Sequence, residues 1–146
     1  MDNLELAKCT ECACFNLRKA TRVITQLYDK ALRPTGLRAT QFSLLVAVKM
    51  FGQVTVTRLA KMGVMDRTTL TRNLKPLEKQ GLINIESGED KRERVVTITP
   101  KGIETLAKAL PLWEKAQTRV IKGLGQERWS SVLNNLSEMV SLAKQG

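Results

Sequence analysis

The sequence lacks histidine altogether, and aromatic residues make up only 4% of its 146 positions. Without histidine there is no Ser-His-Asp or Cys-His pair to activate a nucleophile, no imidazole ligand for a metal and no histidine pH switch. These absences argue against an enzyme, because most nucleophilic and metal-assisted mechanisms need such a group. We therefore expect no catalytic residues, no metal site and no cofactor.

Cysteine is scarce and confined to one end, where Cys9, Cys12 and Cys14 are the only three in the chain. Three cysteines so close together cannot form disulfides that hold distant parts of a fold together, which indicates a reducing compartment. The first residues, Met1 to Glu5, are polar and do not resemble a signal peptide. No apolar run approaches the roughly 18 residues that cross a bilayer. We expect a cytoplasmic protein with no membrane association.

Basic residues are abundant, with 24 Lys and Arg against 14 Asp and Glu, for a net charge of +10. The 42% of hydrophobic residues is enough to bury a core, so the chain is expected to fold. Small, basic, folded proteins most often bind polyanions, and nucleic acid is the first candidate. The excess charge is spread along the chain, so it indicates a class of partner without locating a site.

Apolar residues recur at three- and four-residue steps in several segments that glycine or proline ends. Thr55, Asp66 and Thr99 are candidate N-caps of three of the segments, and Pro100 suits the first helical position after Thr99. Pro76 predicts a kink or a loosened last turn in its helix, and Pro111 predicts a bend. The pattern predicts one domain with helices near residues 14–32, 40–51, 55–63, 66–81, 100–124 and 129–143.

Two β-branched segments, Leu82–Ile85 and Val95–Thr99, alternate with a period of two and predict paired strands. The nine residues between them are almost wholly polar and would project as a wing. The predicted fold is therefore mainly α with a small β-hairpin wing. Apolar helices that flank a complete small core usually pack against a second subunit, which predicts a homodimer. The expected single domain, 1–146, has a winged helix-turn-helix core at about 38–100 and dimerisation helices at about 12–36 and 101–146.

The helix predicted after Asp66 combines a narrow apolar stripe with an opposite face of long cationic and short hydroxyl side chains. Arg67 and Arg72 suit bidentate bonds to guanine in a major groove, whereas Arg92 in the wing suits a narrow minor groove. Other residues of the set suit phosphate contacts. The residues predicted to contact double-stranded DNA are Thr55, Thr57, Arg67, Thr68, Thr69, Thr71, Arg72, Lys75, Lys91, Arg92 and Arg94.

The predicted wing also carries four carboxylates, which simple attraction to DNA does not explain. Asp90 lies two residues before Arg92, and a carboxylate there can hold a guanidinium by two parallel hydrogen bonds. We predict that Asp90 orients Arg92 for DNA. The alternative is an ordinary ion pair of a turn, which contributes little.

The segments Asp66–Leu74 and Asp90–Arg92, with Val95, Ile98–Thr99 and Gly102, resemble the recognition helix and wing signature of the multiple-antibiotic-resistance regulator (MarR) family. The resemblance covers about residues 15–145, with a wing shorter than many and a proline at position 76 as departures. It implies a dimeric winged-helix repressor with intertwined terminal helices. It further implies a palindromic operator, and release by a small aromatic or lipophilic effector or by cysteine oxidation.

The cysteines Cys9, Cys12 and Cys14 leave alternatives open. Nearby cations and a helix start would favour thiolates, so they are candidates for a thiol switch or a redox or metal-responsive site. Three ligands without a histidine or a fourth cysteine make an incomplete zinc site. The favoured interpretation is a frayed N-terminus with incidental thiols. A winged-helix module that binds protein instead of DNA is the other alternative.

Overall fold

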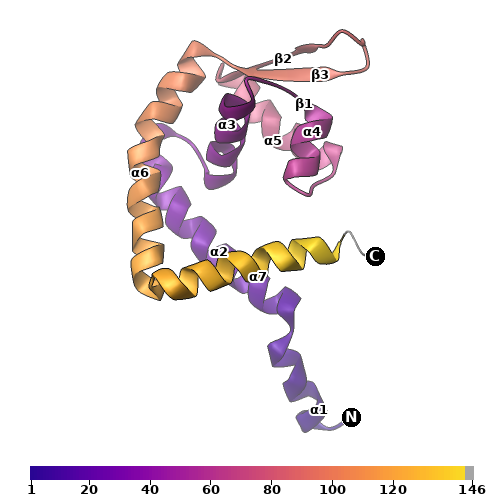
Figure 1. Ribbon diagram of the computed structural model, residues 1–146, viewed down its shortest axis with the longest axis vertical. Coiled ribbons are helices and arrows are strands. Elements are labelled where there is room, and N and C mark those ends of the chain that lie inside the picture. Colours follow the sequence, from indigo (N-terminus) through magenta and orange to yellow (C-terminus); the bar gives the residue numbers. More distant parts are fainter. Residues whose placement is uncertain (144–146) are drawn as a thin grey trace.

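The computed structural model describes residues 1–143, and the last three residues of the predicted C-terminal dimerisation region lie outside it. Figure 1 shows a winged-helix unit at one end of the molecule and long helices at the other. The elements in chain order are α1 (Asn3–Ala7), the 3-10 helix η1 (Lys8–Glu11), α2 (Ala13–Leu32), the 3-10 helix η2 (Arg33–Thr35), α3 (Ala39–Phe51), β1 (Gln53–Thr55), α4 (Val56–Met62), α5 (Arg67–Lys79), β2 (Ile83–Ser87), β3 (Arg94–Ile98), α6 (Pro100–Leu124) and α7 (Gln126–Leu142).

Side-chain caps explain where three of these helices begin. The Thr55 hydroxyl accepts a hydrogen bond from the Arg58 backbone N–H at the start of α4. Asp66 caps α5 in the same way, and Thr99 caps α6, where Pro100 takes the first helical position. The predicted starts of these helices are therefore confirmed, because each depends on local hydrogen bonds within a few residues.

The sheet has one more strand than the sequence predicts. In the described residues it contains β1, β3 and β2 in that order, all antiparallel. The added strand, β1, pairs Val54 with Val96 in the middle of β3. Three residues are too few to show an alternating pattern, so no local signal marks this strand. The hairpin strands also extend further than predicted, which leaves only residues 88–93 as the loop of the wing.

Two prolines lie inside helices that continue past them. Helix α5 contains Pro76 and remains helical to Lys79, so the predicted loosening of its last turn is wrong. Helix α6 runs without interruption from Pro100 to Leu124 through Pro111. Each proline removes one backbone donor. The packing of these helices outweighs that loss, since α6 contacts α2, α3 and α7 along its length.

The hydrophobic core lies mostly within the winged-helix unit, and buried residues of α2 and α6 complete it. The apolar stripe of α5 is fully buried, and it packs between α3, α4 and the sheet. The ring of Trp113 on α6 stacks on Phe42 of α3 with the ring centroids 5.8 Å apart, which joins the unit to the long helix. The side chains with the lowest exposure in the core are Leu32, Leu45, Val48, Leu70, Leu74, Leu77, Val96 and Ala109.

The N-terminal segment is helical, which corrects the predicted frayed terminus. Asp2 and Glu5 form a capping box at the start of α1, with each side chain accepting from the other end of the turn. Figure 1 shows α1 projecting away from the body beyond the start of α2. Within residues 1–143, no helix is long and apolar enough to span a membrane.

Candidate nucleic-acid interface

The candidate interface is built on α5, whose direction is set by its N-cap. Asp66 Oδ1 accepts from the Thr69 backbone N–H at 2.7 Å, and Oδ2 accepts from the Thr69 hydroxyl at 3.0 Å. The backbone bond from Thr69, followed by the hydroxyl bond, holds the pKa of the Asp66 carboxyl below its usual value. The carboxylate is therefore charged at neutral pH and completes the first turn of the helix.

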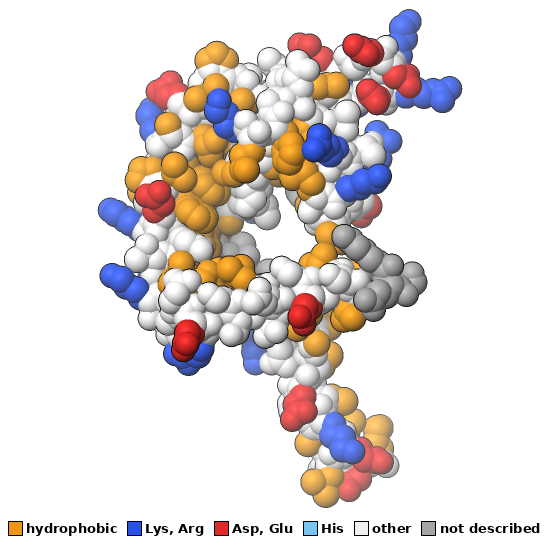
Figure 2. Space-filling view, in the orientation of Figure 1, with side chains coloured by type: hydrophobic (Ala, Val, Ile, Leu, Met, Phe, Trp, Pro, Cys, Tyr) orange, Lys and Arg blue, Asp and Glu red, His pale blue; other side chains and the backbone are white. Residues whose placement is uncertain are grey.

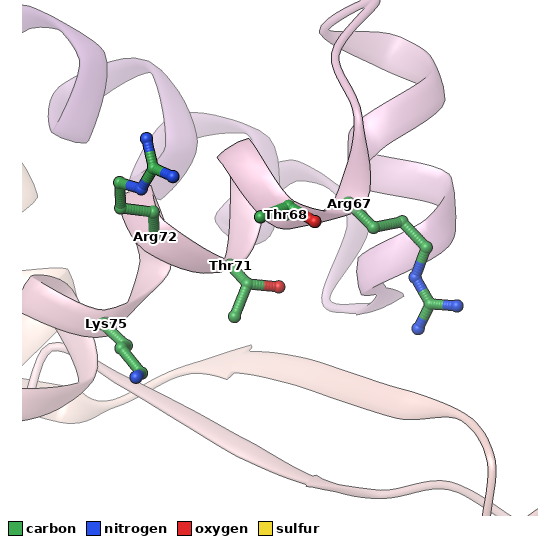
Figure 3. Close-up of a pocket in the computed structure, with 5 residues that line it drawn as sticks. All are labelled: Arg67, Thr68, Thr71, Arg72 and Lys75. Atoms are coloured by element: carbon green, nitrogen blue, oxygen red, sulfur yellow. The ribbon is translucent and has the colours of Figure 1, made fainter.

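The two faces of α5 have opposite environments. Leu70, Leu74 and Leu77 are fully buried and anchor the helix on the core. The opposite face is exposed and forms an open concavity of about 400 Å³. Its lining residues, drawn in Figure 3, are Arg67, Thr68, Thr71, Arg72 and Lys75. Three cations and two hydroxyls thus share one exposed surface, as the sequence predicts.

A second groove, of about 300 Å³, lies between α5 and the hairpin. Figure 3 shows Arg67, Thr71 and Lys75 extending toward the hairpin side of the helix, whereas Arg72 extends the other way. Arg94 of β3 lines the same groove, and so does Glu78 of α5. Glu78 is a residue that our sequence reasoning missed, although it lies three residues after Lys75 on the same helical face.

The tip of the wing is held by its own backbone. Gly88 N–H donates to Glu93 O, and Glu93 N–H donates to Asp90 O, both at 2.9 Å. Lys91 and Arg92 are exposed at this tip, and Figure 2 shows acidic and basic side chains side by side there. The wing cations are therefore carried on a short hydrogen-bonded loop that projects beyond the sheet.

Asp90 contacts Arg92 in a different way from the one predicted. Its Oδ1 accepts from the Arg92 backbone N–H at 3.0 Å, and within residues 1–143 its carboxylate forms no ion pair with the Arg92 guanidinium. A short Asp side chain readily bonds the backbone two residues ahead, which shapes a turn at little entropic cost. The expected bidentate pair is wrong for this state, and Asp90 shapes the backbone of the loop.

Three of the predicted threonine contacts have distinct positions. Thr69 is half-buried and its hydroxyl is engaged by Asp66, so it supports the helix from within. The Thr55 hydroxyl is engaged as the cap of α4. Thr57 is exposed in the first turn of α4. Of these three, Thr57 has the side chain most accessible to a phosphate.

The cysteines lie far along the chain from this surface. Cys9 lies in η1, Cys12 occupies the N-cap position of α2 without a side-chain capping hydrogen bond, and Cys14 follows in the first turn. All three are exposed free thiols. Within the described part of the chain, no group of three or more Cys, Asp or Glu side chains is arranged to hold a metal ion.

Comparisons with known proteins agree on one family. A family model described as MarR family matches residues 35–93. The solved structure of the M. tuberculosis transcriptional regulator MosR in complex with DNA has a TM-score of 0.85 and 38% sequence identity, and the match covers 92% of this chain and 98% of MosR.

Two curated regulators are similar over shorter stretches. The uncharacterised HTH-type transcriptional regulator YwoH of Bacillus subtilis is 31% identical over 86 residues, which cover 59% of this chain and 63% of YwoH. The HTH-type transcriptional regulator Hpr of Bacillus pumilus is 30% identical over 97 residues, or 66% of this chain and 47% of Hpr. The matches thus span about half to just under two thirds of these two proteins.

Proposed function

This chain belongs to the MarR family of winged helix-turn-helix transcriptional regulators, and we propose that it is a homodimeric repressor that binds a palindromic DNA operator. The observation that carries the proposal is the exposed face of α5, where Arg67, Thr71, Arg72 and Lys75 share one concavity. The presence of DNA in the MosR structure supports DNA as the polyanion for this surface. Regulation of transcription, not catalysis, is the proposed activity.

The chemistry of α5 suits reading of a major groove. The guanidinium groups of Arg67 and Arg72 can each donate two hydrogen bonds to guanine O6 and N7. Thr68 and Thr71 add short hydroxyls and methyls that fit thymine or phosphate. Lys75 and Arg94, which line the groove between α5 and the hairpin, suit the phosphates of the strand that would pass through it.

The wing would reach a neighbouring minor groove. Arg92 and Lys91 are exposed at its tip, and narrow A·T-rich minor grooves attract such cations. The Asp90 turn limits the conformations of this tip before DNA arrives, which reduces the entropy lost on binding. The acidic residue thereby contributes through order in the loop, although its charge opposes the phosphates.

A homodimer would satisfy the apolar faces that the single chain leaves exposed. Leu17 and Ile24 of α2 and Leu133 and Val140 of α7 are all more than one third exposed. We assign residues 38–100 to DNA binding, with 12–36 and 101–146 as dimerisation segments. Two-fold symmetry then places the two α5 helices on half-sites about 10 base pairs apart, or a multiple of that distance.

Release of DNA by a small aromatic or lipophilic effector completes the proposal. A pocket of about 380 Å³ lies between α2, α6 and α7, and its lining is mostly apolar. Tyr28 lines it, and its hydroxyl donates to the Gln117 side chain between α2 and α6. A ligand that favours one packing of these helices would change the separation of the two α5 helices by shifting the population of dimer geometries.

The test begins with selection of bound sites from a random pool of double-stranded DNA. We expect a palindrome, retardation that weakens steeply with salt, and an affinity about 10- to 100-fold lower in Arg72→Ala. Arg119→Ala is the control, because Arg119 is exposed on α6, away from the concavity. If no salt-dependent retardation occurs and Arg72→Ala changes nothing, the chain is a protein-binding module and the proposal fails.

An oxidative signal is the second candidate for release, favoured by three exposed thiols within six residues. A peroxide would join two of the thiols in a disulfide and leave as an alcohol and water, so electrons balance. Such a bond would distort the turn at Cys12 that leads into α2. If peroxide weakens DNA binding and Cys12→Ser/Cys14→Ser abolishes that response, the thiols are the sensor. If the double variant responds to peroxide as the wild type does, the thiols are incidental.

A further inference from the structure

The junction between the end of α5 and the start of α6 is unusually well bonded. Helix α5 ends in a Schellman motif, in which Leu82 N–H donates to Leu77 O and Gly81 N–H to Glu78 O, both at 2.9 Å. Gly81 has a φ of 75°, the left-handed conformation that this motif requires. The motif satisfies carbonyls inside the helix but leaves those of residues 80, 81 and 82 pointing out of it.

Those three consecutive carbonyls all accept hydrogen bonds from the start of α6. Lys101 Nζ donates to Gln80 O at 2.8 Å, and the Thr99 hydroxyl donates to Gly81 O at 2.6 Å. The Thr99 backbone N–H donates to Leu82 O at 3.0 Å. The Lys101 ammonium also lies at the negative end of the α5 dipole, which strengthens its bond. We call Thr99, Lys101 and the three carbonyls the α5–α6 clamp.

Gly102 allows the clamp to close. A Cβ atom at this position would lie 2.1 Å from Leu82 O, far inside contact distance. Gly102 N–H donates in turn to the Thr99 hydroxyl at 3.0 Å, so one hydroxyl both caps α6 and holds α5. The backbones of the two elements therefore meet without an intervening side chain, which leaves little freedom between them.

We propose that the α5–α6 clamp, with Lys101 as its outermost positioning residue, sets the direction of the DNA-reading helix relative to the dimerisation helices. This inference rests on the proposed function, because it concerns how a dimer presents α5 to two half-sites. A helix tied to α6 by three carbonyls moves with α6 as one body. The clamp thereby makes the protein discriminate between operators whose half-sites are correctly and wrongly spaced.

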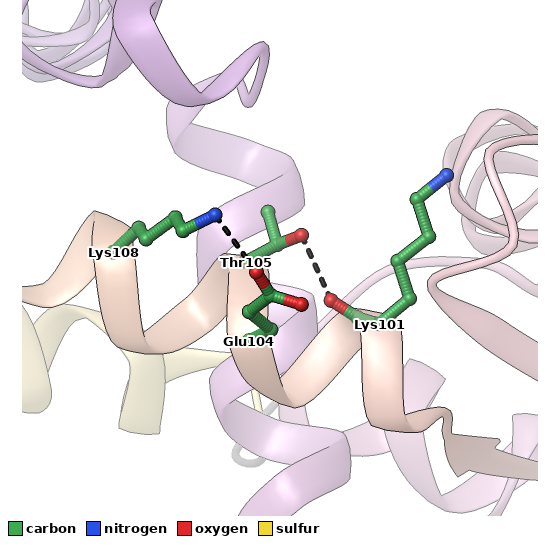
Figure 4. Close-up of polar contacts among 4 residues, drawn as sticks. All are labelled: Lys101, Glu104, Thr105 and Lys108. Atoms are coloured by element: carbon green, nitrogen blue, oxygen red, sulfur yellow. Dashed lines mark hydrogen bonds and ion pairs between the residues drawn. The ribbon is translucent and has the colours of Figure 1, made fainter.

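The chain offers a matched control for removing the Lys101 contact. Lys108 lies seven residues later on α6, and its ammonium binds Glu104 at 2.8 Å. Figure 4 shows Lys101 extending away from the helix toward the end of α5, whereas Lys108 turns back to Glu104. Lys101→Met and Lys108→Met therefore remove the same charge from the same helix, but only the first cuts the clamp. Lys101→Arg keeps the charge and the hydrogen-bond donors, so it should retain the wild-type behaviour in the experiments below.

The DNA experiment compares affinity for the selected operator with affinity for operators that have one base pair added or removed between half-sites. We expect Lys101→Met to bind the correctly spaced operator about tenfold more weakly than the wild type, which is the scale of one charge-assisted hydrogen bond. Its affinity for the operators with altered spacing should fall by less. Its slope of log affinity against log salt should match the wild type. If Lys101 instead touched a phosphate directly, its removal would lower that slope by about 0.9.

Hydrogen exchange tests the clamp without DNA. The amides of Gly81 and Leu82 should exchange faster in Lys101→Met than in Lys108→Met, because the Schellman turn is deprived of its outer support. Equal exchange, unchanged spacing preference or a reduced salt slope would each overturn the clamp as a positioning device. If the wild type binds no DNA, the proposed function fails. If it binds DNA and the variants discriminate spacing as well as the wild type, only the clamp fails.

Discussion

Helix α5 of the winged-helix unit and the outer helix α7 differ in how far their apolar side chains are buried. In the unit, Leu70, Leu74 and Leu77 of one short helix are fully buried by the same chain. Helix α7, described along its whole length, buries no side chain, and Leu133, Met139 and Val140 are each more than 40% exposed. Figure 2 shows apolar surface along the long helices, beside a hollow that separates α7 from the winged-helix unit.

The contrast indicates that the winged-helix unit, together with Leu32 of α2 and Ala109 of α6, forms a closed core within one chain, whereas the outer helices carry apolar residues that this core does not cover. A core that excludes water stabilises itself, whereas exposed apolar stripes gain free energy only when another surface covers them. Folding of the unit should therefore be independent of protein concentration, and order in the outer helices should depend on it. Substitutions in each part of the chain test this division.

The largest effect is expected in the core. Leu74→Ala should lower the free energy of unfolding by about 2–5 kcal/mol, because it removes buried methyl groups and leaves a cavity. Denaturant unfolding at several protein concentrations measures it. A loss below about 1 kcal/mol would mean that the unit relaxes around the cavity and is less tightly packed than the burial indicates.

On the outer helices, Leu133→Glu should weaken the dimer about 100-fold. The side chain is 46% exposed in the single chain, so covering the remainder stabilises each copy by about 1 kcal/mol or more, and two-fold symmetry doubles the effect. Sedimentation velocity over a concentration series measures it, with Asn134→Glu as the control on the next position. A wild type that stays monomeric at all concentrations would contradict the homodimer.

Within α5, two neighbouring threonines should separate stability from DNA binding. Thr71→Val should lower DNA affinity by about threefold to tenfold and leave unfolding unchanged, because its side chain lines the concavity. Thr69→Val should lower unfolding stability by about 0.5–1 kcal/mol, because its hydroxyl donates to Asp66. Retardation and thermal unfolding of both variants measure the split. If Thr69→Val lowered DNA affinity and Thr71→Val lowered stability instead, the DNA-reading face would lie elsewhere on the helix.

The Asp66 cap of α5 should make the stability of the protein depend on pH in the acid range. Because the folded pKa of Asp66 is lowered, its stabilisation is full above the unfolded pKa of about 3.9 and is lost as pH falls through the folded pKa. Between about pH 5 and about pH 3, the Tm of wild type should fall more than that of Asp66→Asn, which caps but does not titrate there. Glu104, whose pKa Lys108 lowers, contributes equally in both proteins. If the Tm of the wild type and that of Asp66→Asn fall equally with pH, Asp66 is not the source of the acid sensitivity.

The smallest effect is expected in the wing. Asp90→Ala should weaken operator binding about twofold, because the Arg92 N–H loses its acceptor and the tip gains freedom. Glu89→Ala removes the same charge from the adjacent residue and should leave binding equal or tighter. Retardation of both variants at one salt concentration measures the difference. If Asp90→Ala binds as tightly as Glu89→Ala, the turn contributes nothing to recognition.

Much of this protein follows from local sequence. The Thr55, Asp66 and Thr99 caps and the alternation in the hairpin each depend on residues that are near one another in the chain. The set on α5 is likewise local, because helical spacing alone places Arg67, Thr71 and Lys75 on one face. These features identify the fold class and the candidate surface without any knowledge of long-range contacts.

The tertiary structure decided the features that join distant residues. Strand β1 exists because β3, more than 40 residues later, supplies its hydrogen bonds. Helix α5 stays helical for three residues past Pro76, where a local rule allows a loosened last turn, and α6 continues for thirteen residues past Pro111. The α5–α6 clamp joins Lys101 to Gln80 across 21 residues, because the close approach at Gly102 creates a contact that no spacing in the sequence encodes.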